Sequence, residues 1–177
     1  MKFLNNNSVP WKVASKTCAI KAKPLTSLLV DRFITRRFLI DTLEGKEPLG
    51  DGVVICIGPA EDVWQQMPSK LFDKYNVVDI DSSGWMLCEP KVGNSVNVFE
   101  VTEHNKSDTS IFSTVDDVNV YQTCDFYIHG KWGETTPFGP NVQYGNIGDF
   151  ICQNRTDSTD IWIVRRKIFL NTYVLKG

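Results

Sequence analysis

Short apolar runs separated by polar or glycine-containing turns recur along the whole chain. The runs are rich in β-branched and aromatic residues, a composition typical of strands. The clearest are VVICI (53–57), WMLCEP (85–90), SVNVFEV (95–101) and IWIV (161–164). Counting all such runs predicts roughly ten to thirteen strands at spacings of about 8 to 12 residues, joined mainly by hairpins. The pattern therefore indicates a mainly β fold with minor α content.

Part of this pattern occurs twice, in the stretches from Gly50 to Tyr75 and from Gly148 to Tyr173. At a constant offset of 98 residues, Gly50, Asp51, Asp62, Trp64 and Tyr75 recur as Gly148, Asp149, Asp160, Trp162 and Tyr173. A glycine, two aspartates, a tryptophan and a tyrosine in register are unlikely to recur by chance. We interpret the match as an internal duplication, which predicts two related, small barrel-like or sandwich-like β modules.

Each copy predicts a strand, a hairpin loop, a second strand and one helical turn. The all-polar run QNRTDST (153–159) and the run GPAED (58–62) are the loops. The runs SKLFDKY (69–75) and RKIFLNTY (166–173) carry apolar residues at spacings that fit a short helix packed against a sheet. The aspartates beside the turns are expected to accept hydrogen bonds from backbone amides, and the repeated tryptophans are expected in the core.

The second copy resembles the PGDYG protein family, which is found mostly in bacteria and phages. The resemblance rests on Gly148 and Asp149, with Phe150 in the place of the family's tyrosine, and on an ending made by Phe169, Thr172 and Tyr173. Ile147 and Ile151 depart from the motif, and the first copy keeps only its Gly-Asp pair. The resemblance implies a small bacterial or phage domain and no particular activity.

The rest of the chain predicts the following organisation. Residues 1–10 are expected to form a loose leader, 11–80 the first module and 81–177 the second, with the boundary near 79–94. We expect a strand pair in 11–23, a short helix over 25–32 followed by a strand, a strand accessible on one side over 95–101, and a turn at Asp116-Asp117. The runs HNKSDTS (104–110) and TTPFGPNVQYGN (135–146) are expected to be loops.

Composition and charge narrow the class of protein. Of 177 residues, 42% are hydrophobic and 23% charged, which indicates a globular chain. The net charge of −2 gives no reason to expect general binding to nucleic acid or to an anionic membrane. The longest apolar run has five residues, too few for a membrane span, so a cytoplasmic protein is expected, in the host cell if the gene is a phage's. The five dispersed cysteines predict neither a metal site nor a disulfide framework, and no cofactor is expected.

A few side chains are candidates for binding chemistry. The run His129-Gly130-Lys131-Trp132-Gly133 combines a basic and an aromatic side chain with glycines, so it could hold a planar or anionic ligand. Arg165 and Arg166 could join Lys131 in a phosphate site, and Trp85 could contribute to a ligand or partner surface. The plainer alternative for each is a solvated strand end or a turn.

These observations lead to one preferred hypothesis and two alternatives. The preferred one is a non-catalytic binding protein of bacterial or phage accessory type, without a metal. It would bind either a small anionic, nucleotide-like ligand or a host protein, and a counter-defence factor is one example of such a protein. The first alternative is an enzyme acting on a nucleotide-like substrate, with His129 as acid or base. The second is a structural component of a virion or larger complex. The oligomeric state stays open, a homo-oligomer included.

Overall fold

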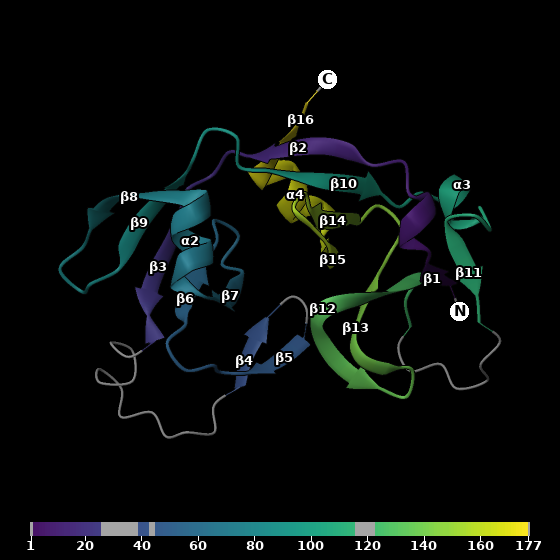
Figure 1. Ribbon diagram of the computed structural model, residues 1–177, viewed down its shortest axis with the longest axis horizontal. Helices are drawn as coiled ribbons and strands as arrows, with labels where there is room; N and C mark the ends of the chain where they lie inside the picture. Colours follow the sequence, from purple (N-terminus) through teal and green to yellow (C-terminus); the bar gives the residue numbers. More distant parts are fainter. Residues whose placement is uncertain (1, 26–38, 43–44, 116–122, 177) are drawn as a thin grey trace. The chain divides into compact units, whose positions relative to one another are not determined.

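The computed structural model describes residues 2–25, 39–42, 45–115 and 123–176, and in this part the chain is mainly β. It divides into two compact units (Figure 1). The first unit consists of residues 1–15 and 95–177, and the second consists of residues 16–94. The predicted fold class is confirmed. The division differs from the expected one, because the second unit is inserted between two separate pieces of the first.

The first unit contains a five-stranded sheet covered on one face by a short helix. Its strands, in spatial order, are β15 (Asp157–Val164), β14 (Phe150–Asn154), β10 (Ser95–Glu100), β2 (Lys12–Lys16) and β16 (Tyr173–Leu175). The helix α4 (Arg166–Thr172) places Phe169 against this sheet, where its ring stacks on that of Phe150 at 3.7 Å between centroids. Helix and sheet therefore enclose one apolar core.

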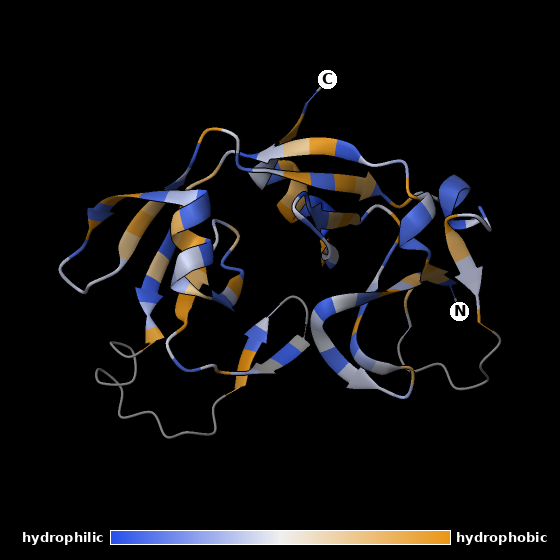
Figure 2. Cartoon of the chain, in the orientation of Figure 1, coloured by the Kyte–Doolittle hydropathy of each residue, from blue (hydrophilic) through white to orange (hydrophobic). Residues whose placement is uncertain are grey.

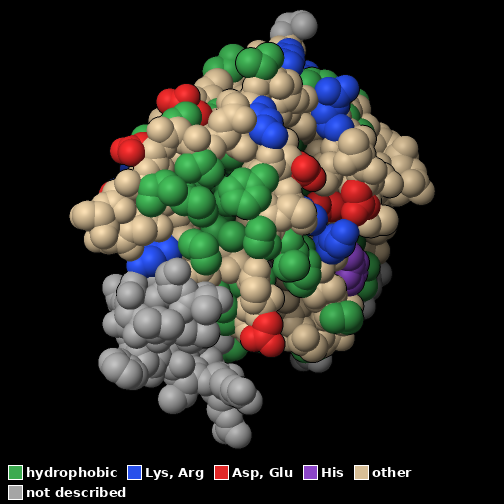
Figure 3. All heavy atoms as spheres, turned by 60° about the vertical axis from the view of Figure 1, so that its left-hand side comes forward, with side chains coloured by type: hydrophobic (Ala, Val, Ile, Leu, Met, Phe, Trp, Pro, Cys, Tyr) green, Lys and Arg blue, Asp and Glu red, His purple; other side chains and the backbone are tan. Residues whose placement is uncertain are grey.

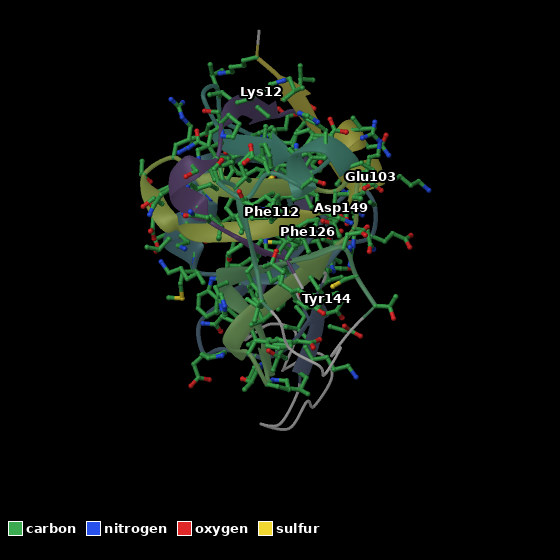
Figure 4. All side chains as sticks on the ribbon, turned by 90° about the vertical axis from the view of Figure 1, so that its right-hand side faces the viewer. Lys12, Glu103, Phe112, Phe126, Tyr144 and Asp149 are labelled. Atoms are coloured by element: carbon green, nitrogen blue, oxygen red, sulfur yellow. The ribbon has the colours of Figure 1, made fainter. Side chains whose placement is uncertain are left out.

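A four-stranded sheet covers the opposite face. It consists of β11 (Phe112–Thr114), β1 (Lys2–Leu4), β12 (Phe126–Thr136) and β13 (Gly139–Gly145), and the short helices η1 (Asn6–Ser8) and α3 (Glu103–Lys106) lie in its connections. Phe112 and Phe126 are fully buried between the two sheets, with ring centroids 5.8 Å apart (Figure 4). The first unit is thus a β-sandwich with a helix on its outer side.

The second unit has a five-stranded sheet of its own. The order is β7 (Val63–Gln66), β6 (Val54–Ile57), β3 (Ile20–Pro24), β9 (Met86–Pro90) and β8 (Tyr75–Ile80). Helix α2 (Pro68–Lys74) buries Leu71 on one face, and a hairpin of β4 (Leu39–Thr42) and β5 (Gly45–Pro48) packs Ile40 on the other. Strand β6 is apolar along its length (Figure 2), because Val54 packs under α2 while Ile55 packs with Ile40 on the other face.

The two five-stranded sheets share one arrangement. In each, a hairpin (β6–β7 or β14–β15) leads into a helix and then into an edge strand, and the hairpin pairs with a central strand, β3 or β10. Even the register agrees, because Cys56 lies opposite Trp64 and Cys152 lies opposite Trp162. The likeness is one of arrangement, and it differs from the sequence match in one detail. Gly52 (φ 69°), and not Gly50, is the counterpart of Gly148 (φ 93°) before the hairpin.

One strand of each sheet directly precedes, in sequence, the central strand of the other sheet. Strand β2 directly precedes β3 in sequence, yet it pairs with β10 in the first unit. Strand β9 directly precedes β10, yet it pairs with β3 in the second unit. The two sheets have therefore exchanged these first strands, β2 and β9. The expected strand pair over 11–23 is wrong for this reason, since β2 and β3 belong to different sheets.

Two other expectations are corrected by burial. Residues 1–10 are not a loose leader, because β1 pairs with β11 and β12 and buries Phe3, and Val9 also lies in the core. Strand β10 is not accessible on one side. Val98 faces the core under α4, and Phe99 faces the core shared with the four-stranded sheet. A central strand between two layers is buried on both faces.

Two expected loops are also corrected. Residues 135–146 form most of the β12–β13 hairpin, whose strands end at Thr136 and begin again at Gly139. The run 104–110 begins within α3, where Thr102 and Asn105 form a capping box. The expected helix over 25–32 and the turn at 116–117 lie outside the described residues, apart from Leu25.

Candidate functional site

The run of residues 129–133 forms an irregularity in β12 and not a ligand loop with free backbone. The pairing of β12 with β13 shifts register between His129 and Glu134. The buried Gln143 amide fills the irregularity, donating to the Trp132 carbonyl at 2.8 Å and accepting from the Ile163 amide at 2.9 Å. Gly133 has a φ of 145°, which explains one of the two glycines by backbone geometry alone.

His129 is exposed on β12, and its ring stacks on that of Phe3 at 5.1 Å between centroids. Catalysis by a histidine base would need a nucleophile or substrate group held near it. The described contacts of the His129 ring are with an apolar neighbour. The geometry supports a packing role for this side chain.

Lys131 is paired with a carboxylate. Its ammonium lies 2.8 Å from Oδ2 of Asp157, at the start of β15. The hydrogen bond to Asp157 raises the pKa of Lys131 above its usual range, and the same bond lowers the pKa of Asp157. Trp132 beside it is about half exposed, at 53%.

Arg165 and Arg166 are also paired, at the start of α4. The Arg165 guanidinium donates to Asp149 at 2.7 Å, and Arg166 forms an ion pair with Glu100. Asp149 additionally accepts from the backbone amides of Asn146 and Arg166. The expectation that Asp149 holds turn amides is therefore confirmed, whereas Asp160 accepts from the side-chain amide of Asn154.

The structure does not bring these cations together. Lys131 is held at the first residue of β15, while Arg165 follows the last. At about 3.3 Å per residue, the eight residues of this strand separate its ends by roughly 20–25 Å. Trp85 belongs to the second unit, where it packs beside Val53 and Ile55 with the Lys23 ammonium 6.0 Å from its ring. The six predicted residues do not form one site within either unit.

The buried cysteines are not arranged for nucleophilic chemistry. Burial raises the pKa of Cys56 to about 11, and it also raises the pKa values of Cys88 and Cys124. Thiols of this kind stay protonated near neutral pH. Among the residues that the structure describes, no group of three or more His, Cys, Asp or Glu side chains is placed to hold a metal ion.

The second unit carries the feature that the sequence analysis did not single out. Large apolar side chains lie exposed along α2 and β8, with Phe72 46% and Ile80 60% accessible. We call this the α2–β8 surface, and its members are Met67, Phe72, Val77, Val78 and Ile80. Figure 3 shows hydrophobic side chains gathered over this part of the molecule. The run NVVDID (76–81) could have indicated this exposed surface from the sequence. A strand with one covered face would show a more regular alternation of apolar and polar residues.

The first unit exposes related positions. Leu170 of α4 corresponds to Phe72 of α2, and Leu175 of β16 corresponds to Val77 of β8, both at the offset of 98. Leu170 is 58% accessible. Strand β16, however, has three residues against six in β8, so the exposed edge is longer in the second unit.

Comparisons with known proteins give no assignment. No protein-family model matches the chain, and no match was found among curated proteins or among solved structures. Within the described residues, none of the helices combines the length and the apolar character needed to cross a membrane.

Proposed function

We propose that this chain is a non-catalytic binding protein and that its target is another protein, held at the α2–β8 surface. The observation that supports the proposal is the exposure of five apolar side chains, one at the N-cap of α2, one in α2 and three in β8. Keeping such side chains in water is unfavourable, at about 25 cal/mol for each Å² of apolar area. Contiguous apolar patches on soluble proteins commonly mark interaction sites.

The charged candidates favour this choice over a small anionic ligand. Each of Lys131, Arg165 and Arg166 already has a carboxylate partner, so a phosphate would have to displace Asp157, Asp149 or Glu100. Moreover, Asp149 also holds two backbone amides, and its displacement would expose them. The preferred hypothesis from the sequence offered two targets, a small anionic ligand or a protein. Of these two we therefore retain the protein.

The aromatic side chain of Phe72 gives the sharpest test. Phe72→Asp should remove binding without unfolding the protein, because Phe72 is half exposed and Leu71 makes the buried contact of α2. Leu170→Asp is the matched control, since it makes the same kind of change at the corresponding position of α4. The bait would be the whole chain, with a photo-crosslinking amino acid at Met67, in an extract of the cells that naturally contain it.

The expected result is a crosslinked protein partner that is retained by the wild type and by Leu170→Asp and is lost from Phe72→Asp. Equal retention by all three proteins would contradict the α2–β8 surface. A small molecule that stays bound in native mass spectrometry and is released by Arg165→Ala would contradict the choice of a protein target.

A further inference from the structure

We propose that the α2–β8 surface takes its partner as an added strand, paired with the free edge of β8, and that this strand alternates apolar and basic residues. This inference rests on the proposed function and specifies the partner's conformation and chemistry.

Strand β8 is the uncovered edge of its sheet. It is the last strand in the spatial order and pairs with β9 alone among the described strands. Strand β7 at the opposite edge is half-buried throughout, and its Val63 packs in one cluster with Ile40 of β4. In the first unit, Ile161 of β15 shares a core with Ile128 of β12. An uncovered edge presents unpaired N–H and C=O groups, which an extended peptide can pair with.

The usual protection of edges is weak here. Strand β8 contains no proline and no lysine, and five of its six residues are exposed. Its one irregularity is an extra residue between Val77 and Asp79, which leaves the pairing with β9 intact on both sides. The Tyr75 amide bonds to the Leu71 carbonyl, and the Ile80 amide bonds to the Asp79 carboxylate at 2.8 Å. The edge groups offered to an incoming strand therefore lie between these two residues, around Val77 and Val78.

The two faces of β8 differ in chemistry. Val77 lies opposite Cys88 and Ile80 opposite Met86, and both partners belong to the core under α2 or pack against it. The exposed sides of Val77 and Ile80 thus continue the apolar face that α2 begins. Asp79 lies opposite Leu87, on the other face of the sheet. An added strand would meet apolar side chains on one face and a carboxylate on the other.

The charge of the β8–β9 hairpin favours a basic partner. Residues 75–90, which span β8 and β9, contain Asp79, Asp81 and Glu89 and no lysine, arginine or histidine, and Lys74 and Lys91 flank them. The hairpin is therefore acidic, and complementary charge on a partner favours its approach and fixes its register. Since side chains alternate between faces in a strand, apolar residues at every second position with lysine or arginine between them match both faces.

A random twelve-residue peptide library displayed against the whole chain tests this inference. Peptides should be enriched in alternating apolar and basic residues, and their affinity should fall at least about tenfold for Ile80→Lys. Leu175→Lys, at the matching edge of the other sheet, should bind them as the wild type does. Asp79→Lys should weaken basic peptides and strengthen versions in which glutamate replaces their basic residues.

Backbone N-methylation of a selected peptide separates an added strand from side-chain docking. Methylating alternate residues in one of the two registers removes the N–H groups that would pair with β8, and binding should fall by at least about tenfold.

Unchanged binding in both registers, or selected peptides with apolar residues at helical spacing, would overturn the added strand and leave the protein-binding function standing. Failure to enrich any peptide that depends on Ile80, or enrichment of acidic peptides, would overturn the inference as a whole. Self-association of the chain through β8, removed by Ile80→Lys, would identify a second copy as the occupant and would likewise overturn it.

Discussion

The Arg165 guanidinium donates a hydrogen bond of 2.7 Å to the Asp149 carboxylate, which is almost buried. The pair joins the turn before β14 to the first turn of α4, because Asp149 also accepts from the backbone amides of Asn146 and Arg166. A basic run that looks like a phosphate site in the sequence is thus a structural connection within the first unit.

This relationship predicts the effect of removing the acid. Asp149→Ala should lower the free energy of unfolding by about 2–4 kcal/mol, because it leaves Arg165 and two backbone amides without their acceptor. Glu100→Ala, which breaks the exposed pair with Arg166, should cost less than about 1 kcal/mol. Urea unfolding followed by tryptophan fluorescence measures both. Equal losses would show that the Asp149 network is not the connection described here.

Asp125 predicts a dependence of stability on pH. A hydrogen bond from the Ile147 amide at 2.8 Å, aided by the Lys106 ammonium, lowers the pKa of this carboxyl. Because the pKa is lower in the folded state, the stabilisation is fully present above the ordinary pKa of about 3.9. It is lost as the pH falls through the folded-state pKa.

Asp125→Asn should therefore be less stable than the wild type at pH 6, and the difference should disappear on acidification. Urea midpoints measured between pH 6 and pH 2 check the sign. A difference that grows toward low pH would contradict the assignment.

The buried thiols predict a pattern of chemical modification. Cys56 is inaccessible, and burial raises its pKa to about 11, so iodoacetamide at pH 8 should leave it unmodified in the native protein. Cys18, which is partly exposed, should react first. Peptide mapping by mass spectrometry, with a sample unfolded in urea as the control, measures both rates. Native labelling of Cys56 at the rate of Cys18 would show that the β6–β3–β9 core opens readily.

The exchanged strands predict which fragments fold. Residues 16–94 contain every described strand of the second unit, so this fragment should give a dispersed amide NMR spectrum. Residues 11–80, the module expected from the sequence, lack β9 and leave β3 without one of its two neighbours. That fragment should be unfolded or aggregated. The opposite outcome would mean that β9 is dispensable to its sheet.

Local patterns predicted the elements of this fold well. The run IWIV lies in β15, the run 58–62 forms the β6–β7 hairpin loop, and the short helices follow at the expected places. The expected loop over 153–159 is shorter, because only residues 155 and 156 lie between β14 and β15. Each of these depends on neighbours in sequence, such as the periodicity of apolar residues. The proline-rich and glycine-rich run 135–146 misled the prediction. Its Pro140 lies in β13, the last strand in the order of its sheet, where a missing N–H is tolerated.

Pairing between distant segments was not accessible from the sequence. Nothing in the run WKVASKTCAIKAK shows that its first half pairs with residues 95–98 and its second half with 54–57. For the same reason, the acidic partners of Lys131 and Arg166 were not foreseen, since Asp157 and Glu100 lie far away along the chain. The α2–β8 surface is exposed because β8 is the last strand of its sheet. The order of strands in a sheet is also set by pairing between segments that are distant in sequence.

The exchange of first strands also bears on the order in which the protein is made. Strand β2 is synthesised about 80 residues before its partner β10. At a translation rate of 5–20 residues per second, β10 therefore follows β2 after roughly 4–16 s. All of the second unit is synthesised within that interval, so it can fold while the first strand waits unpaired. The first unit closes afterwards, when β16 arrives and the amide of Lys176 bonds to the carbonyl of Val13. Nascent chains are thus expected to fold from the middle of the sequence outward.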